Sequence, residues 1–461
     1  MKLRHLAALG STIAWAACAS HRPSPPPLTS AVLVTVDTMR GDCFGAAGDP
    51  ELRTPYLDRL FRQGAQFASA FSACPMTLPS HTSILSGAWP TTHGVSRNGV
   101  RVPDRVRTLA EILKEQGFAT AAFVSSVALD PTYHLDQGFD VYNFRPVVGK
   151  SVEDAWRPAP RTVHRAVTWW TSTPGRKFLW VHVFEPHFPY EPPAPFSSLY
   201  ETGYHGRWSG SSEDIMALWA DPKRATDRDV AHITSLYRGE ITTVDRGLGI
   251  LLREVEDDPK VAVVLTADHG ESLGEHGLLF KHGPFTYPGD VRVPLVVRGG
   301  PFERSVSLAV VRSIDIAQTV LSLLGVRAEL PPEAKTLAPW IHGGAGLVSY
   351  GVASIGRYRP GTSPWDEVLA TEFSSPDLMR VARTDHAACV EAPWEDRLEW
   401  FDRTVDPGEL HPLPFPGTAE AESLRSGLDR WIGSGVASAE PVADARLKEA
   451  LKSLGYVNEG R

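Results

Sequence analysis

AVLVTVD, at residues 31–37, is an uninterrupted apolar run that ends on a carboxylate. Three further runs share this character, namely KFLWVHVFE (177–185), VAVVLTAD (261–268) and VPLVVRG (293–299). All four are dense in valine, leucine and phenylalanine and show little polar alternation, which is typical of strands that are covered on both faces. These runs therefore predict a buried, mostly parallel sheet.

Stretches with helical periodicity alternate with these strands, at 104–116, 229–255 and 313–324. Such alternation predicts an α/β fold, with a doubly wound, mostly parallel sheet flanked by helices. After about residue 335 the composition shifts toward proline, glycine, tryptophan and charge. We therefore expect a large domain over residues 31–335 and a smaller C-terminal subdomain over residues 336–461.

The composition narrows the class of protein. With 461 residues, 42% of them hydrophobic and 22% charged, the chain can bury a sizeable core. A formal charge of −8 and no block of lysine and arginine argue against a nucleic-acid partner. Beyond Cys18, the three cysteines Cys43, Cys74 and Cys389 allow at most one disulfide and lack the spacing of a thiolate metal site.

The N-terminus predicts export. Met1-Lys2-Leu3-Arg4-His5 is basic, and the apolar run from Leu6 to Ala17 is too short to span a bilayer. We expect residues 1–17 to be a cleaved signal peptide and Cys18 to carry a lipid anchor, although Trp15 stands where such signals usually have leucine. Residues 18–30, which are rich in proline, would then be a stiff tether. The protein would be a periplasmic or cell-envelope lipoprotein held at a membrane.

Polar residues follow three of the predicted strands. Asp37 ends the first, Asp268 and His269 end the third, and His187 lies just beyond the second. Because reactive groups gather at the carboxyl ends of strands in doubly wound folds, these side chains could converge on one divalent cation. Taken alone, an aspartate after a strand is more often a helix cap or turn former, and a single histidine is usually structural or on the surface, but the joint pattern is less easily explained in this way.

The segment PMTLPSHTSILSG (75–87) has the features of a helix start. Thr77 precedes Pro79 at an early helical position, and Gly87 closes the stretch. The Thr77 hydroxyl would then lie near a helix N-terminus, where backbone N–H groups and the helix dipole favour an anion. The alternative is that Thr77 is only an N-cap.

Several motifs in order resemble the sulfatase family of the alkaline-phosphatase superfamily. The likeness runs from Ala31 nearly to the end of the chain. It is carried by these segments: VTVDTMRGDCFG (34–45), TLPSHTSILSGAWPTTHGV (77–95), VHVFEPHFPYEPP (181–193), ADHGESLGEHGLLFKHG (267–283), DIAQTVLSLLGV (315–326) and EWFDRTVDPGEL (399–410).

The resemblance implies a metal centre. It makes Asp37, Asp268 and His269 metal ligands and Thr77 a nucleophile that also contacts the metal. Thr38 occupies the position of a second aspartate in sulfatases that carry formylglycine. The loss of this hard anionic ligand favours Mn²⁺ or Zn²⁺ over Ca²⁺, and we expect one divalent ion.

The resemblance also implies the groups that act on the substrate. Lys281 and His187 match the residues that grip the anionic group and assist the leaving oxygen, with help from His282. The run Thr77-Leu78-Pro79-Ser80-His81 replaces the Cys/Ser-x-Pro-x-Arg sequence that is oxidised to formylglycine. Threonine cannot form that aldehyde, and His81 stands in place of the arginine.

A second departure concerns the sulfate-binding Lys-x-His pair of such sulfatases, since Ser125 and Val127 stand there instead. A threonine nucleophile beside these ligands resembles the phosphodiesterases and phosphotransferases of the superfamily. We therefore expect hydrolysis of a phosphate ester or phosphodiester attacked by Thr77. The alternatives are a sulfuric ester hydrolase that uses unmodified threonine and an anchored protein that binds anionic glycans or lipid headgroups without turnover.

Overall fold

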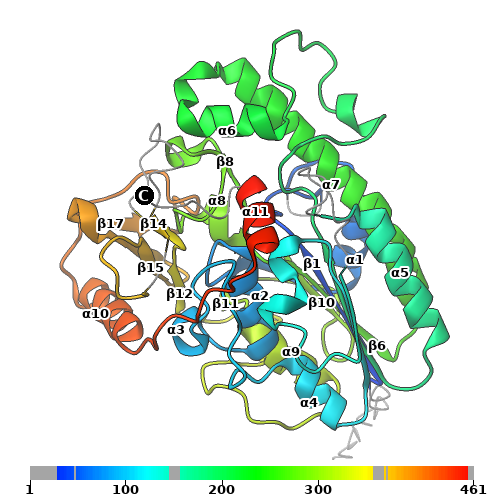
Figure 1. Ribbon diagram of the computed structural model, residues 1–461. Helices are drawn as coiled ribbons and strands as arrows, with labels where there is room; N and C mark the ends of the chain where they lie inside the picture. Colours follow the sequence, from blue (N-terminus) through cyan, green and yellow to red (C-terminus); the bar gives the residue numbers. More distant parts are fainter. Residues whose placement is uncertain (1–27, 46–47, 145–155, 357–367, 370–371, 455–461) are drawn as a thin grey trace, which may run out of the picture.

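A computed structural model describes residues 28–45, 48–144, 156–356, 368–369 and 372–454. A nine-stranded sheet forms its centre, in the order β11-β2-β10-β6-β1-β5-β3-β4, with β9 paired to β2 (Figure 1). Its strands are β1 (Ser30–Val36), β2 (Ala65–Phe71), β3 (Ala119–Phe123), β4 (Val141–Asn143), β5 (Lys177–Val183), β6 (Val261–Ala267), β9 (Arg292–Val293), β10 (Leu295–Arg298) and β11 (Ser305–Arg312). The predicted fold class is confirmed.

The direction of the strands follows the prediction except at β9 and β10. β10 runs antiparallel to its neighbours β2 and β6, and β9 runs antiparallel to β2. The other pairings in the sheet are parallel. All seven residues of β1 and of β6 are buried, as expected for strands covered on both faces.

Helices cover both faces of the sheet. On one face α5 and α1 pack against the long α7, and on the other α2, α4 and α9 contact one another. The bounds are α1 (Pro55–Gln63), α5 (Ala159–Ser172), α7 (Asp227–Val255), α2 (Thr77–Ser86), α4 (Leu109–Glu115) and α9 (Asp315–Leu323). The helix expected from residue 104 begins only at Leu109, because Thr108 and Glu111 form a capping box at that point.

The C-terminal part forms a second, antiparallel sheet in the order β12-β15-β16-β17, beside the main sheet in Figure 1. Its elements are β12 (Ser349–Val352), β15 (Arg380–Arg383), β16 (Ala387–Ala392), β17 (Arg397–Asp402) and α10 (Ala419–Gly433). The last helix, α11 (Ala445–Ser453), leaves this sheet, and its Leu451 joins the core of the main sheet. The domain boundary at residue 335 stays a prediction.

Short elements connect these layers. They are α3 (Pro90–His93), α6 (Ser212–Ala220), α8 (Pro288–Val291), β7 (Ser272–Leu273), β8 (Leu279–Lys281), β13 (Ile355–Gly356) and β14 (Val368–Leu369). In the part of the chain that the structure describes, no helix has both the length and the apolar character needed to cross a membrane. Residues 1–27, on which the signal peptide and the Cys18 anchor were predicted, lie outside the described residues.

The register of three neighbouring strands positions the site. Val36 of β1 lies beside Val183 of β5 and beside Ala267 of β6, and all three strands run in the same direction. The residues that follow these strands therefore emerge at one edge of the sheet. Asp37 and Asp268 are each the first residue beyond their strand, so the register brings these two carboxylates together.

We predict that Asp245 anchors α1 to α7. Its Oδ1 accepts hydrogen bonds from the backbone N–H groups of Tyr56 at 3.0 Å and Leu57 at 2.8 Å, in the first turn of α1. Asp245→Ala should lower the free energy of unfolding by about 1–2 kcal/mol, because it removes the cap of these buried groups. Asp245→Asn keeps the acceptor and should be nearly neutral. Urea unfolding checks this, and equal losses in both variants would contradict a capping role.

Candidate metal centre and active site

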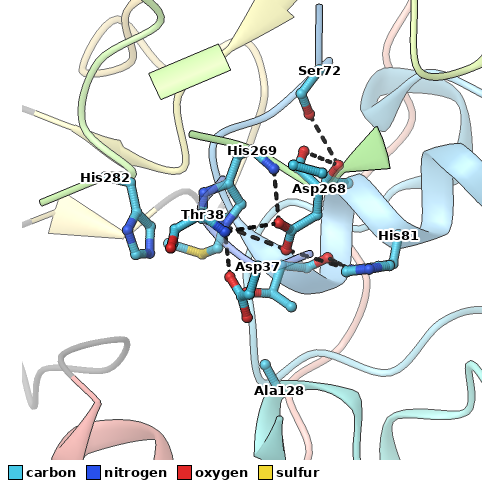
Figure 2. Close-up of polar contacts among 12 residues, drawn as sticks. Asp37, Thr38, Ser72, His81, Ala128, Asp268, His269 and His282 are labelled. Atoms are coloured by element: carbon cyan, nitrogen blue, oxygen red, sulfur yellow. Dashed lines mark hydrogen bonds and ion pairs between the residues drawn. The ribbon is translucent and has the colours of Figure 1, made fainter. Parts of the chain in front are cut away.

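Two carboxylates and one imidazole form the centre of the site. Asp37 follows β1, whereas Asp268 and His269 follow β6, and all three side chains are fully buried. His269 Nε2 lies 3.7 Å from Asp37 Oδ1 and 3.5 Å from Asp268 Oδ2. Figure 2 shows the His269 ring facing both carboxylates. The three ligand atoms lie within 4.8 Å of one another, a spacing at which one ion could be bound by all three.

Backbone groups orient these side chains. The N–H of His269 donates to Asp268 Oδ1 at 2.8 Å, and the N–H of Thr38 donates to the same oxygen at 3.3 Å. Asp268 Oδ2 is thereby left to face the centre. His269 Nδ1 donates to the carbonyl of Gly270 at 2.9 Å, so Nε2 carries the lone pair that a metal ligand requires.

Unsatisfied atoms show that the site fits a divalent cation. Both oxygens of Asp37, Asp268 Oδ2, His269 Nε2 and Thr38 Oγ1 are buried and have no hydrogen-bond partner among the described residues. Buried polar atoms are rarely left without a partner, and here several converge on one point. Oxygen and nitrogen donors of this kind suit a divalent ion. This cluster is therefore consistent with a divalent metal site, whose metal the donor set alone does not identify. A second set of ligand atoms, which was not predicted from the sequence, also lies within 4.8 Å of one another, on His81, His182 and Asp268.

The pKa shifts of the two carboxylates also support a site for a divalent cation. Burial and the neighbouring Asp268 raise the pKa of Asp37 well above its usual value. Burial acts in the same direction on Asp268, but His269, His81 and His182 hold the pKa of Asp268 below its usual value. Two carboxylates this close resist ionising together, and a bound cation removes that conflict.

Thr38 is held in a strained conformation. Its φ of 51° lies in the left-handed region, which a β-branched residue rarely adopts. Tyr237 of α7 fixes the loop, because its hydroxyl donates to the Thr38 carbonyl at 2.8 Å and accepts from the N–H of Arg40 at 3.2 Å. Strain of this kind persists only where the surroundings impose it, and it is common at functional sites.

Thr77 is the first residue of α2 and is fully buried. The first turn of this helix is attached to the metal group, since Ser80 Oγ donates to the backbone oxygen of Asp268 at 2.6 Å. His81 Nδ1 donates to the Thr77 carbonyl at 2.8 Å and lies 3.6 Å from Asp268 Oδ2. His81 therefore links the backbone of Thr77 to the side chain of Asp268, although the two residues lie far apart in the sequence.

The helix N-terminus differs from the expectation in one respect. The N–H of Leu78 is donated to Asn98 Oδ1 at 2.8 Å, Pro79 has no N–H, and the N–H of Ser80 bonds to the Met76 carbonyl at 3.1 Å. The backbone cradle expected to hold an anion is thus largely used within the protein. The helix dipole still favours an anion at the N-terminus of α2.

Asn98 supplies a donor that the sequence did not reveal. Its Oδ1 must face the N–H of Leu78, so its Nδ2 points the other way. Nδ2 is buried and has no hydrogen-bond partner among the described residues. An amide donor beside Thr77 can replace the missing backbone N–H groups in binding an anion.

A row of imidazoles leads away from the metal group. The His282 ring lies 4.4 Å from that of His269 and 5.1 Å from that of His187. Lys281, on β8, lies beside them, with its Nζ 4.0 Å from the centre of the Trp219 ring. Figure 2 shows His282 on the side of His269 that faces away from His81. The ring contact places His187 next to His282.

Glu271 is a second group that the sequence did not single out. Its carboxylate accepts hydrogen bonds from His282 Nδ1 and from the Tyr190 hydroxyl, each at 3.1 Å. Burial raises the pKa of Glu271 to about 8, against the opposing charges of His269 and Lys281. Glu271 therefore fixes the orientation of the His282 ring.

Ser125 and Val127, which the sequence comparison placed where some sulfatases carry a sulfate-binding Lys-x-His pair, are uncharged. Ser125 and Val127 are both buried, and Ser125 Oγ lies 2.7 Å from Thr162 Oγ1. The N–H of Ser125 instead meets His182 Nδ1 at 3.4 Å. His182, on β5, was not among the predicted site residues, although a histidine inside a strand that is buried beyond its first residue is a usable signal.

Comparisons with known proteins agree with this geometry. The family model described as Sulfatase matches residues 29–326. The chain is 24% identical over 334 residues to the ulvan-active sulfatase of Formosa agariphila, covering 65% of this chain and 62% of that protein. It is 25% identical over 399 residues to the multifunctional alkaline phosphatase superfamily protein PehA of Trinickia caryophylli, covering 67% and 76%.

Solved structures share the fold. The phosphonate monoester hydrolase of Agrobacterium radiobacter aligns with a TM-score of 0.64 at 20% identity, covering 89% of this chain and 95% of that one. The family match itself spans well over half of this chain. The chain therefore belongs to the sulfatase family of the alkaline-phosphatase superfamily, and it is a hydrolase of sulfuric or phosphoric esters.

Proposed function

We propose that the protein hydrolyses a phosphate ester or phosphodiester, with Thr77 as the nucleophile. The observation that supports this proposal is the hydrogen bond from Ser80, in the first turn of α2, to the backbone oxygen of Asp268, because Thr77 begins that helix. A hydroxyl next to such a centre can attack without prior oxidation.

The other groups take complementary roles. The divalent cation, when bound, lowers the pKa of the attacking hydroxyl and polarises a substrate oxygen. Lys281 offsets charge on the transferred group, and Asn98 donates a hydrogen bond to it. His187 or His282 assists the leaving oxygen.

Two features favour phosphorus over sulfur in the substrate. Thr77 cannot become formylglycine, and the uncharged Ser125 and Val127 replace a sulfate-binding cationic pair. PehA, a multifunctional alkaline phosphatase superfamily protein, and the phosphonate monoester hydrolase of similar fold are consistent with phosphorus chemistry. Sulfuric ester hydrolysis by unmodified threonine is the second candidate, favoured by the family match.

The metal is proposed to be Mn²⁺ or Zn²⁺ rather than Ca²⁺. Thr38 contributes a neutral hydroxyl where a second aspartate would stand, and His269 contributes nitrogen. Fewer hard anionic oxygens and one imidazole favour the transition metals. We further propose that the substrate is a small anionic ester, a glycan or a lipid headgroup, and that Cys18 anchors the exported enzyme near it.

The substrate class and the nucleophile can be tested together. Matched aryl phosphate monoesters, phosphodiesters and sulfates are offered to protein stripped of metal and reloaded with Mn²⁺, Zn²⁺ or Ca²⁺. Thr77→Ala should lower kcat on the preferred ester by about 10²-fold or more, whereas Thr77→Ser should keep part of it. The control Thr82→Ala removes a threonine from the same helix whose hydroxyl, among the described residues, donates to the Leu78 carbonyl alone, and it should leave turnover unchanged.

Turnover of sulfates alone would make the second candidate correct. No turnover with any metal would favour a protein that binds its anionic ligand without hydrolysis. Equal activity of Thr77→Ala and the unaltered protein would reject Thr77 as the nucleophile.

Asn98 should matter as a donor to the transferred group. Asn98→Asp keeps the oxygen that caps the N–H of Leu78 but replaces the Nδ2 donor by an anionic oxygen. We expect kcat to fall by about 10²-fold, the usual cost of losing one such donor. Thermal unfolding should also shift, because the variant buries a carboxylate where Asn98 is 1% exposed, so circular dichroism checks that the variant is folded before kcat is compared. Unaltered kcat in Asn98→Asp would place the amide outside the substrate site.

A further inference from the structure

His182 lies close to the metal group, on β5, the strand that pairs with β1 just before Asp37. It occupies the register position opposite Thr35 of β1, two residues before Asp37. Its side chain is fully buried, as is that of Asp37. His182 Nε2 is 3.5 Å from Asp37 Oδ2 and has no hydrogen-bond partner among the described residues.

The surroundings of His182 determine which ring nitrogen carries the proton. The backbone N–H of Ser125 points at Nδ1 from 3.4 Å, so Nδ1 must present its lone pair. A proton on Nδ1 would direct two donors at each other. The single proton therefore resides on Nε2, which faces the carboxylate of Asp37.

The neighbouring His81 is fixed in the same manner. Trp180 Nε1 donates to Thr35 Oγ1 at 3.0 Å, and this hydroxyl donates in turn to His81 Nε2 at 2.9 Å. His81 Nδ1 then carries the proton, donates to the Thr77 carbonyl and lies 3.6 Å from Asp268 Oδ2. The His81 and His182 rings meet edge to face, with centres 4.9 Å apart.

The same argument makes His182 a poor metal ligand. Coordination through Nε2 would require the proton to move to Nδ1. The Nδ1–H group would then face the N–H of Ser125, so that two buried donors would point at each other. The contacts of His182 instead suit a residue whose Nε2–H is directed at the carboxylate of Asp37.

We propose that His182 is a positioning residue of the metal centre, whose Nε2–H orients the carboxylate of Asp37 for metal binding. His81 lies next to Asp268 in the same way as His182 lies next to Asp37, with its Nδ1 3.6 Å from Asp268 Oδ2. Outer partners of metal ligands commonly contribute about 10- to 100-fold in metal affinity. This inference rests on the metal centre of the proposed function but not on the identity of the ester.

Two polar substitutions of His182 distinguish the role of Nε2 from the role of Nδ1. His182→Gln carries an amide that reaches the position of Nε2, toward Asp37. His182→Asn carries a shorter amide that reaches only the position of Nδ1, toward the N–H of Ser125. His93→Gln is the control, since His93 is equally buried but bonds to Ser83 and to the N–H of Val95.

The experiment measures affinity for Mn²⁺ and Zn²⁺ by competition with a chelating dye, without any substrate. His182→Asn should lose about 10- to 100-fold in affinity, His182→Gln should keep most of it, and His93→Gln should match the unaltered protein. The absorption spectrum of the Co²⁺-loaded protein should be the same in His182→Gln as in the unaltered protein. Circular dichroism establishes that each variant is folded.

Equal affinities of His182→Asn and His182→Gln would overturn the proposal, because the Nε2 donor would then have no specific effect. A changed Co²⁺ spectrum in His182→Gln would overturn it as well, since that result would make His182 a ligand. A failure of the proposed ester chemistry appears only in turnover and leaves these readouts unaffected.

Discussion

The rest of the structure depends on the approach of two buried carboxylates, Asp37 and Asp268, at the ends of neighbouring parallel strands. The register of β1 and β6 brings them together, and burial leaves no water to separate their charges. Two such groups cannot both ionise without compensation, and one divalent cation supplies it. The buried donor atoms that lack partners in the chain are those that such an ion would satisfy.

The surrounding elements fix the positions of the two carboxylates but do not neutralise their charges. Tyr237 imposes a left-handed conformation on Thr38, whose N–H binds Asp268. Ser80 attaches the first turn of α2 to the same residue, and with it Thr77. The start of α2 and the two carboxylates are therefore linked by one set of contacts, so a disturbance of Asp268 would also displace the first turn of α2.

The sequence predicted much of this arrangement because strand ends are visible in the pattern. Asp37, Asp268 and His269 terminate apolar runs, and a parallel sheet places such ends at one edge. The direction of β10 was not predictable, since an apolar run looks alike in either direction. The roles of His182 and Asn98 were also hidden, because the first depends on which strand lies beside β1 and the second on how a loop returns to α2.

The most direct test of the metal centre is a crystal structure of the Mn²⁺-loaded protein with data collected at the manganese absorption edge. The account predicts one anomalous peak bound by Asp37, Asp268 and His269, with Thr77 beside it and His182 hydrogen-bonded to Asp37. An anomalous peak bound by His81 and His182, or no peak between the two carboxylates, would contradict it.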